Sequence, residues 1–309
     1  KNIGIDMTLL NKRLTVTVDY YHKVTDPLLI SINMPTSSGV TTYATNAGKQ
    51  ISQGLTASLS YYILQKLDKR LSWLVRGNLR TQTTELDGIG NKLSSLNQYG
   101  KSRNTVRYYD GADPDDLWAV KSAGIDPSTG RELFYDKEGN YTYDYSYDNE
   151  VICGNKRPDI EGVLGTSFAY KGFSLSLNFR YQMGASVFNE ALYTKVENIT
   201  DYEIVYNQDK RALYERWQKP GDIRKFKNIA DASKTPMSSR FIQKENALAL
   251  ESIYVGYEFL EGWVRKAGLS SLKVQASMRD VFRASTIKSE RGTLYPFART
   301  VELGLSLNF

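Results

Sequence analysis

The sequence lacks long hydrophobic runs and is poor in the side chains that bind soft metals. No unbroken apolar stretch is longer than four residues, whereas a membrane-spanning helix needs about 20. Helical membrane proteins are therefore excluded. The one cysteine, Cys153, cannot form an internal disulfide, and the one histidine, His22, leaves few ligands for zinc or copper. Catalysis that depends on histidine is disfavoured for the same reason.

The composition also excludes a disordered chain and disfavours a nucleic-acid partner. Of the 309 residues, 12% are aromatic, and disordered chains lack such side chains. The net charge of +6 comes with no dense basic patch, because lysines and arginines are spread among acids and the richest stretch, 224–227, is brief. The chain begins at Lys1 without an initiator methionine, and a strand pattern is present from Ile3. We therefore expect a segment that begins inside a domain.

Apolar and polar residues alternate along much of the sequence, which is the pattern of β-strands with two different faces. In the last ten residues, Val301, Leu303, Leu305 and Leu307 share one face. Nine segments follow this rule, so the prediction is an all-β protein. Glu251 falls on the mostly apolar face of its segment, which predicts a bulge or a register error there. The predicted strands are 3–9, 14–20, 55–61, 71–79, 164–170, 173–181, 247–259, 272–278 and 300–309.

Short and long connections alternate strictly between these strands. The short connections are 10–13, 63–70, 171–172 and 260–271. The long connections are about 24–51, 81–161, 183–246 and 279–299. Outer-membrane barrels have short periplasmic turns and long extracellular loops, so the alternation predicts an antiparallel up-and-down transmembrane β-barrel segment. The long connections would then be extracellular and the C-terminus periplasmic.

The polar faces of the strands favour a barrel with lipid outside and a polar lumen. A soluble barrel would have to bury Asp6, Asp19, Arg76, Lys273 and Glu302, whereas an apolar face turned outward to outer-membrane lipid removes this conflict. The alternative is a two-sheet β-sandwich with its own apolar core, and the long loops count against it. Several aromatic residues near predicted strand ends are placed for interfacial girdles. They are Tyr20, Trp73, Tyr170, Tyr181, Tyr257 and Trp263.

An odd number of strands indicates an incomplete barrel. Bacterial single-chain barrels have even strand counts, and an open sheet in lipid would leave backbone groups unsatisfied, at a cost of several kcal/mol each. The ninth strand ends at Phe309, so we expect the missing part before Lys1. We interpret residues 1–309 as the C-terminal portion of one barrel domain.

A series of short motifs runs through the chain. They are Asn46-Ala47-Gly48-Lys49, Asp126-Pro127-Ser128-Thr129-Gly130, Tyr170-Lys171-Gly172-Phe173, Gln182-Met183-Gly184, Arg216-Trp217-Gln218-Lys219-Pro220-Gly221-Asp222, Ser238-Ser239-Arg240-Phe241 and Gly304-Leu305-Ser306-Leu307-Asn308-Phe309. In this order they resemble the barrel of SusC-like (SusC/RagA type) TonB-dependent transporters. The sequence departs from the family pattern at Asp280 and Val281, where Asn-Leu is usual.

The resemblance implies a plugged barrel of the 22-stranded type, of which this chain would be the C-terminal part. A signal peptide, an N-terminal plug and a segment that contacts TonB would lie outside this chain. The implied function is TonB-dependent import of oligosaccharides or peptides across the outer membrane, without enzyme activity. The implied partner is a SusD-like surface lipoprotein, and pairs of transporter and lipoprotein could dimerise.

The connection 81–161 is the best candidate for ligand contact, because it combines aromatic rings with polar side chains. Aromatic platforms stack on the apolar faces of sugars, and Asp, Asn and Arg hydrogen-bond to hydroxyls. The alternative for each residue is packing within the loop or against the lipoprotein. No catalytic, cofactor-binding or metal-binding residue is predicted. The candidate ligand or lid contacts are Tyr108, Tyr109, Asp113, Asp115, Trp118, Arg131, Tyr141, Tyr143 and Tyr145.

Calcium is the one cofactor that the acidic residues suggest. Asp110, Asp113, Asp115 and Asp116 offer oxygen ligands, but Lys121 stands where an EF-hand has glutamate. We interpret the stretch as a solvated acidic turn, and calcium in the loops or in the lipoprotein partner stays open.

Two other functions also stay open. A passive porin would have no plug. An outer-membrane barrel enzyme would need an activated nucleophile, which the single histidine disfavours.

Overall fold

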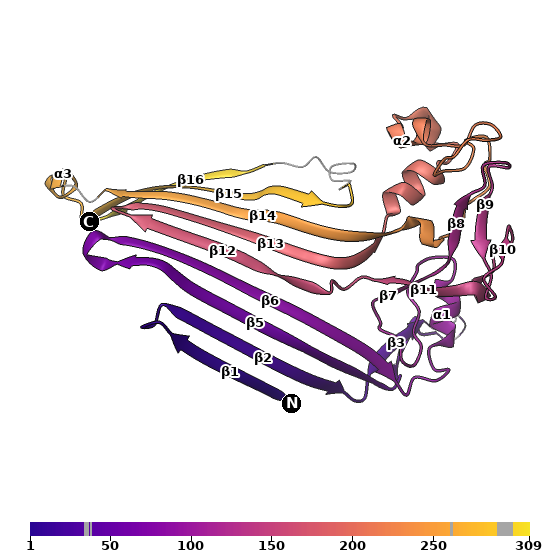
Figure 1. The fold of residues 1–309 in the computed structure, drawn as a ribbon, viewed down its shortest axis with the longest axis horizontal. Helices are drawn as coiled ribbons and strands as arrows, with labels where there is room; N and C mark the ends of the chain where they lie inside the picture. The colour runs from indigo at the N-terminus through magenta and orange to yellow at the C-terminus, as the bar shows by residue number, and fades with distance from the viewer. Residues whose placement is uncertain (34–36, 38, 260–261, 289–298) are drawn as a thin grey trace.

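Nine long strands form one antiparallel sheet. The computed structural model describes residues 1–33, 37, 39–259, 262–288 and 299–309. Figure 1 shows the strands side by side as a curved wall, in the order β1-β2-β5-β6-β12-β13-β14-β15-β16. All nine predicted strands are confirmed. Their bounds are β1 (Asn2–Leu9), β2 (Leu14–Thr25), β5 (Lys49–Lys66), β6 (Leu71–Asp87), β12 (Ile160–Tyr170), β13 (Phe173–Phe188), β14 (Ile242–Phe259), β15 (Ser271–Ser285) and β16 (Val301–Asn308).

Several strands are longer than predicted at the end that carries the long connections. β6 continues to Asp87 and pairs there with β5, which begins at Lys49. The predicted long connections therefore start too early: the connection after β6 begins at residue 88, and the one after β13 begins at residue 189. The strand ends were missed because 81–84 is polar on both faces and gives no alternation. Residues 289–298 of the predicted connection 279–299 lie outside the described ranges.

The short connections all lie at the opposite end of the sheet (Figure 1). Between β12 and β13 the turn consists of Lys171 and Gly172, whose φ angles are 46° and 93°. Two-residue hairpin turns of this type require positive φ at both positions. The turn after β5 contains η2 (Leu67–Lys69), and the turn after β14 contains α3 (Gly262–Lys266). Residues 260–261 of the latter turn are not described.

Aromatic rings gather near these turns. Tyr257, Phe259 and Trp263 form a chain of edge contacts, with ring centroids 4.9 and 5.5 Å apart. Tyr170 ends β12 at the two-residue turn. Tyr181, predicted near a strand end, is instead in the middle of β13, because that strand continues to Phe188.

The irregularity predicted at Glu251 is confirmed. The pairing of β13 with β14 shifts between Asn178 and Phe179, so that Glu251 has no directly opposite partner. Its carboxylate instead forms an ion pair with Arg180 of β13. The bulge thus places a charged side chain of β14 with the polar residues of the neighbouring strand.

The two faces of the sheet differ in the way the alternation predicts. Leu303 and Leu305 are 82% and 65% exposed on the apolar face, which no second sheet covers within the described ranges. On the polar face, Arg76 donates to Asn178 over 3.1 Å, and Asn178 donates to Ser252 over 2.9 Å. The β-sandwich alternative is wrong for this part of the chain, since a sandwich would bury the apolar face.

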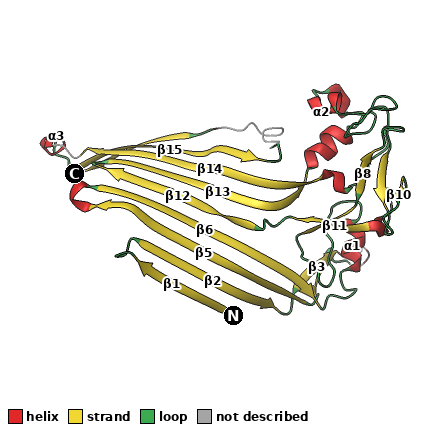
Figure 2. Cartoon of the chain, viewed as in Figure 1, coloured by secondary structure: helices red, strands yellow, loops and turns green. Residues whose placement is uncertain are grey.

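The connection between β6 and β12 and the connection between β13 and β14 fold into compact structure at one end of the sheet, as Figure 2 shows. We call residues 88–159 the first excursion, residues 189–241 the second excursion, and the two together the cap. No helix in the described ranges is long and apolar enough to cross a membrane. The elements of the cap are α1 (Ser94–Gly100), β7 (Asp116–Val120), β8 (Ser122–Ile125), β9 (Glu132–Tyr135), β10 (Tyr141–Thr142), η3 (Tyr147–Asn149), β11 (Glu150–Asn155), η4 (Leu192–Glu197), η5 (Glu203–Val205), α2 (Lys210–Tyr214) and η6 (Ser239–Phe241).

The clusters of buried apolar residues lie in the cap and at its base. One cluster belongs to the second excursion and includes Val196 and Phe241, both fully buried. The other joins Leu86 at the end of β6 to Ile89 and Leu93 of the first excursion. The hairpin of β3 (Leu29–Asn33) and β4 (Thr42–Asn46) packs against this second cluster through its apolar residues. The cap therefore has a packed interior of its own.

Candidate functional site

The two excursions are joined to each other by backbone and side-chain contacts. Val120 of β7 forms a parallel bridge with Ser238, and the amide of Ser122 donates to the Ser239 hydroxyl over 2.9 Å. Further out, the Trp217 indole donates to the carbonyl of Pro127 over 2.9 Å. The cap is thus one structure built from two distant parts of the sequence.

A buried charge cluster lies at this junction. Arg240 donates to Glu132 over 2.8 Å and to Glu197 over 2.6 Å, and all three side chains are nearly inaccessible to solvent. Burial lowers the pKa of Arg240, but the two carboxylates raise it above its ordinary value. Arg216 is also buried and donates to the carbonyl of Lys227 over 3.0 Å. The contact between Arg240 and Glu132 joins the two excursions, whereas Arg216 holds parts of the second excursion together.

The acidic turn is engaged in internal contacts. Asp113 and Asp115 both pair with Arg157, and Asp113 also accepts a hydrogen bond from the backbone amide of Thr84 in β6. Burial raises the pKa of Asp113. Asp110 accepts from the amide of Ile89 over 2.7 Å. The predicted contacts Asp113 and Asp115 therefore fasten the base of the cap to β6. No group of three or more potential metal ligands is found among the described residues.

Two of the predicted tyrosines are packing residues. Tyr108 packs against the buried cluster of Leu86, Ile89 and Leu93. Tyr145 is half-buried, with its ring centroid 5.3 Å from that of Phe134. Burial raises the pKa of the Tyr145 hydroxyl.

Three other predicted residues lie in or next to the hairpin formed by β9 and β10 of the first excursion. Arg131 stacks over the ring of Tyr143, with the guanidinium 4.5 Å from the ring centroid. The Tyr143 hydroxyl donates to Asp126 and holds the pKa of that carboxyl below its ordinary value. Tyr141 is 67% exposed and contacts Tyr135. These contacts are all formed among residues 126–143.

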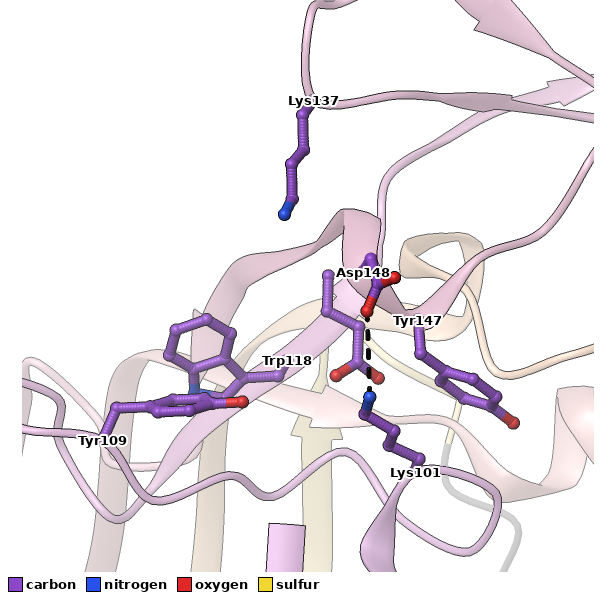
Figure 3. Close-up of a pocket in the computed structure, with 7 residues that line it drawn as sticks. Lys101, Tyr109, Trp118, Lys137, Tyr147 and Asp148 are labelled. Atoms are coloured by element: carbon purple, nitrogen blue, oxygen red, sulfur yellow. Dashed lines mark ion pairs between the residues drawn. The ribbon is translucent and has the colours of Figure 1, made fainter. Parts of the chain in front are cut away.

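Tyr109 and Trp118 come together at a cavity of about 380 Å³ (Figure 3). Their ring centroids are 5.0 Å apart, at an interplanar angle of 61°. The size falls within the range of about 300–1,000 Å³ that is usual for ligand pockets. The lining residues are Lys101, Tyr109, Trp118, Lys137, Tyr147, Asp148 and Glu150, and we call this space the Trp118 cavity.

Charged residues that the prediction did not name complete this cavity. Lys101 lies 4.0 Å from Asp148, and Lys137 reaches the cavity from the turn between β9 and β10. Glu150 is held by the fully buried Arg107 through contacts of 2.6 and 2.9 Å. The sequence carries no signal for this grouping, because the residues come from separate elements of the first excursion.

A larger cavity of about 910 Å³ was also missed. It lies between the second excursion and residues Ser102 and Arg103 of the first. Charged and polar side chains make up most of its lining, among them Glu197, Arg216 and Lys227. On its wall, Lys195 forms an ion pair with Glu203, which lowers the pKa of that carboxyl. Few aromatic rings line this cavity, so a prediction based on aromatic platforms does not include it.

No family model matches the chain. Among curated proteins, it is 25% identical to TonB-dependent receptor P39 of Formosa agariphila, over 91% of this chain and 31% of that protein. It is 24% identical to TonB-dependent receptor SusC of Bacteroides thetaiotaomicron, over 100% of this chain and 31% of that protein. The chain is SusC-like.

Solved structures agree with this result. The SusC-like chain superposes on the RagAB peptide importer in its open-open state with a TM-score of 0.79 and 21% identity, over 100% of this chain and 34% of that one. The closed-closed state gives a TM-score of 0.75 and 23% identity, over 92% and 31% of the two chains. This likeness shows a shared fold.

The SusC-like chain spans about a third of the length of the curated relatives that it matches. Its sheet is a partial wall of a larger outer-membrane β-barrel. The exposed apolar face of β16, with Leu303 and Leu305, is therefore the lipid-facing side, and the face that carries Asn178 lines the lumen.

Proposed function

We propose that the protein containing this chain imports nutrients across the outer membrane, with energy supplied through TonB. The observation that carries the proposal is the match to TonB-dependent receptors along 91% or more of the chain in the relatives described above. A barrel wall with a polar inner face and a cap at one end is suited to such a role. The names of the relatives are those of receptors and importers, which supports transport over an enzyme activity.

The orientation and partners follow from the same proposal. The cap faces the outside of the cell and the short turns face the periplasm, as the loop asymmetry of outer-membrane barrels suggests. A SusD-like lipoprotein docks on the cap, and TonB contacts a part of the protein outside this chain. The transported substrates are oligosaccharides or peptides, and transporter and lipoprotein pairs can dimerise.

Several exposed apolar side chains on the second excursion support a protein partner. Tyr202, Val205, Tyr214 and Ile223 are all more than half exposed, and Ile223 reaches 87%. Large exposed apolar patches on soluble parts of proteins are typical of interaction sites. Val205 ends η5 and Tyr214 ends α2, and Figure 1 places α2 at the upper edge of the cap.

The proposal can be tested by uptake in cells. Deletion of the gene should abolish uptake of the substrate at low external concentration, and loss of TonB should have the same effect. Co-purification from detergent-solubilised outer membranes should recover a surface lipoprotein, together with ligand trapped between the two proteins. Uptake that persists without TonB would favour a passive porin. Hydrolysis of lipid or peptide by the purified protein would favour a barrel enzyme.

A further inference from the structure

The Trp118 cavity combines aromatic walls with an unpaired ammonium group. We propose that it binds an acidic sugar unit, in which a carboxylate or sulfate is carried on a pyranose ring. This inference rests on the proposed import function and assigns a ligand class to one place in the cap. Its evidence is the charge balance of the cavity, the position of its rings and the rigidity of its walls.

The charge balance favours an anion. Both oxygens of Glu150 are taken up by Arg107, so this carboxylate is neutralised before a ligand arrives. Asp148 is close to Lys101, whose ammonium also lies 5.9 Å from the ring centroid of Tyr147. Lys137 has no ion pair within the described part of the chain, and Figure 3 shows its ammonium directed into the cavity. One positive charge is thus left over at the entrance.

The rings favour a ligand with a flat apolar face. Tyr109 is 41% exposed at the cavity, and Trp118 lies behind it in an edge-to-face contact. Tyr147 forms the facing wall (Figure 3). Sugar rings present C–H faces that stack on aromatic side chains such as these.

The walls are fixed before a ligand binds. The Ser146 hydroxyl accepts a hydrogen bond of 3.3 Å from the backbone amide of Asp148 and so caps η3. Trp118 belongs to β7, which pairs with β11 through Ile152. A site whose side chains are already ordered loses less conformational entropy on binding. The exception is Lys137, whose exposed chain is free to follow the ligand.

Equilibrium binding to the intact transporter tests the proposal. Uronic-acid oligosaccharides are compared with their methyl esters by isothermal titration calorimetry, because the ester removes the charge and keeps the ring. Lys137→Gln should weaken binding of the acid about tenfold, as expected for one charge-assisted contact, and leave the ester unchanged. Lys219→Gln, at an exposed lysine of the second excursion, is the matched control and should change neither.

The aromatic wall is tested with two further variants. Tyr109→Ala should weaken binding of both the acid and the ester, whereas Tyr109→Phe keeps the ring and should retain both. Equal effects of Lys137→Gln on acid and ester would overturn the proposal, as would displacement of the acid by an acidic peptide at the same concentration. Energy-dependent uptake by cells that carry the wild type or Lys219→Gln, an exposed position outside the cavity, measures the import function separately from the subsite. Failure of the subsite is thereby distinguished from failure of the import function.

Discussion

Arg240 donates a hydrogen bond to Glu132 over 2.8 Å, although 108 residues separate them in the sequence. Arg240 comes from the second excursion and Glu132 from the first. Their side chains are 11% and 7% exposed, so the pair is shielded from water. Together with the backbone bridge between Val120 and Ser238, this contact makes the conformation of each excursion depend on the other.

Replacement of Arg240 should loosen the cap. In Arg240→Met, the carboxylates of Glu132 and Glu197 lose their shared cation, and breaking a buried pair typically costs about 3–5 kcal/mol. Hydrogen exchange of β8 and η6 should become faster, while exchange in β13 should stay unchanged. Arg224→Met, at an exposed arginine, is the control. Unchanged exchange in β8 and η6 would show that the two excursions are held by other contacts.

Gly130 should be sensitive to a single added methyl group. A Cβ at this position would lie 2.5 Å from the ring of Trp217, and the φ of 73° disfavours other residues. Gly139 has a similar φ of 86° but open space around it. Gly139→Ala should therefore cost about 1 kcal/mol from backbone strain alone, and Gly130→Ala should cost more. The rate at which a protease cuts the cap compares the stability of the two variants. Equal rates for Gly130→Ala and Gly139→Ala would argue against tight packing of Trp217 on the turn that contains Gly130.

The start of α2 should lose stability in acid. A hydrogen bond from Arg211 lowers the pKa of Asp209 from 3.8 to about 2. Because the folded-state pKa is the lower one, this stabilisation is complete above pH 4 and is lost as the pH falls towards 2. Pepsin, which is active in this range, should cut near Leu213 more readily at pH 2 than at pH 4. In Asp209→Asn the side chain can still cap the N-terminus of α2, but it does not titrate. The ratio of cleavage in the variant to cleavage in the wild type should therefore decrease as the pH is lowered from 4 to 2.

The lipid-facing side of β16 should not tolerate charge. Leu303→Arg places a guanidinium on the apolar face, at a cost of about 2–4 kcal/mol if the residue is near the bilayer midplane. Ser306→Arg, on the lumen-facing side of the same strand, should cost much less. Reversible unfolding from lipid vesicles compares the two variants. A larger loss for Ser306→Arg would reverse the assignment of the faces.

The strands could be predicted because two independent constraints act on them together. The hydrogen-bond ladder imposes a period of two, and lipid on one side selects apolar residues at every second position. Beyond the lipid the second constraint ends, and segments such as 81–87 remain strands without any alternation. The bulge at Glu251 was visible because it lies within the alternating region.

The cap could not be predicted, because its contacts depend on distant residues. Nothing in the local sequence pairs Val120 with Ser238. Tyr108 and Tyr109 show the limit most clearly, since they are adjacent in the sequence but lie in different surroundings. Tyr108 enters a buried cluster, and Tyr109 lines the Trp118 cavity. Composition indicates a candidate stretch of sequence, but only the fold separates a packing residue from a candidate contact.

The anchoring of the cap has a mechanical consequence. The first excursion leaves β6 and returns in β12, and the second leaves β13 and returns in β14. These four strands are consecutive in the sheet. Both excursions therefore stand on one uninterrupted strip of wall and are fastened together above it. A bend or shear of that strip would tilt the whole cap as a rigid block, without a separate hinge in either excursion.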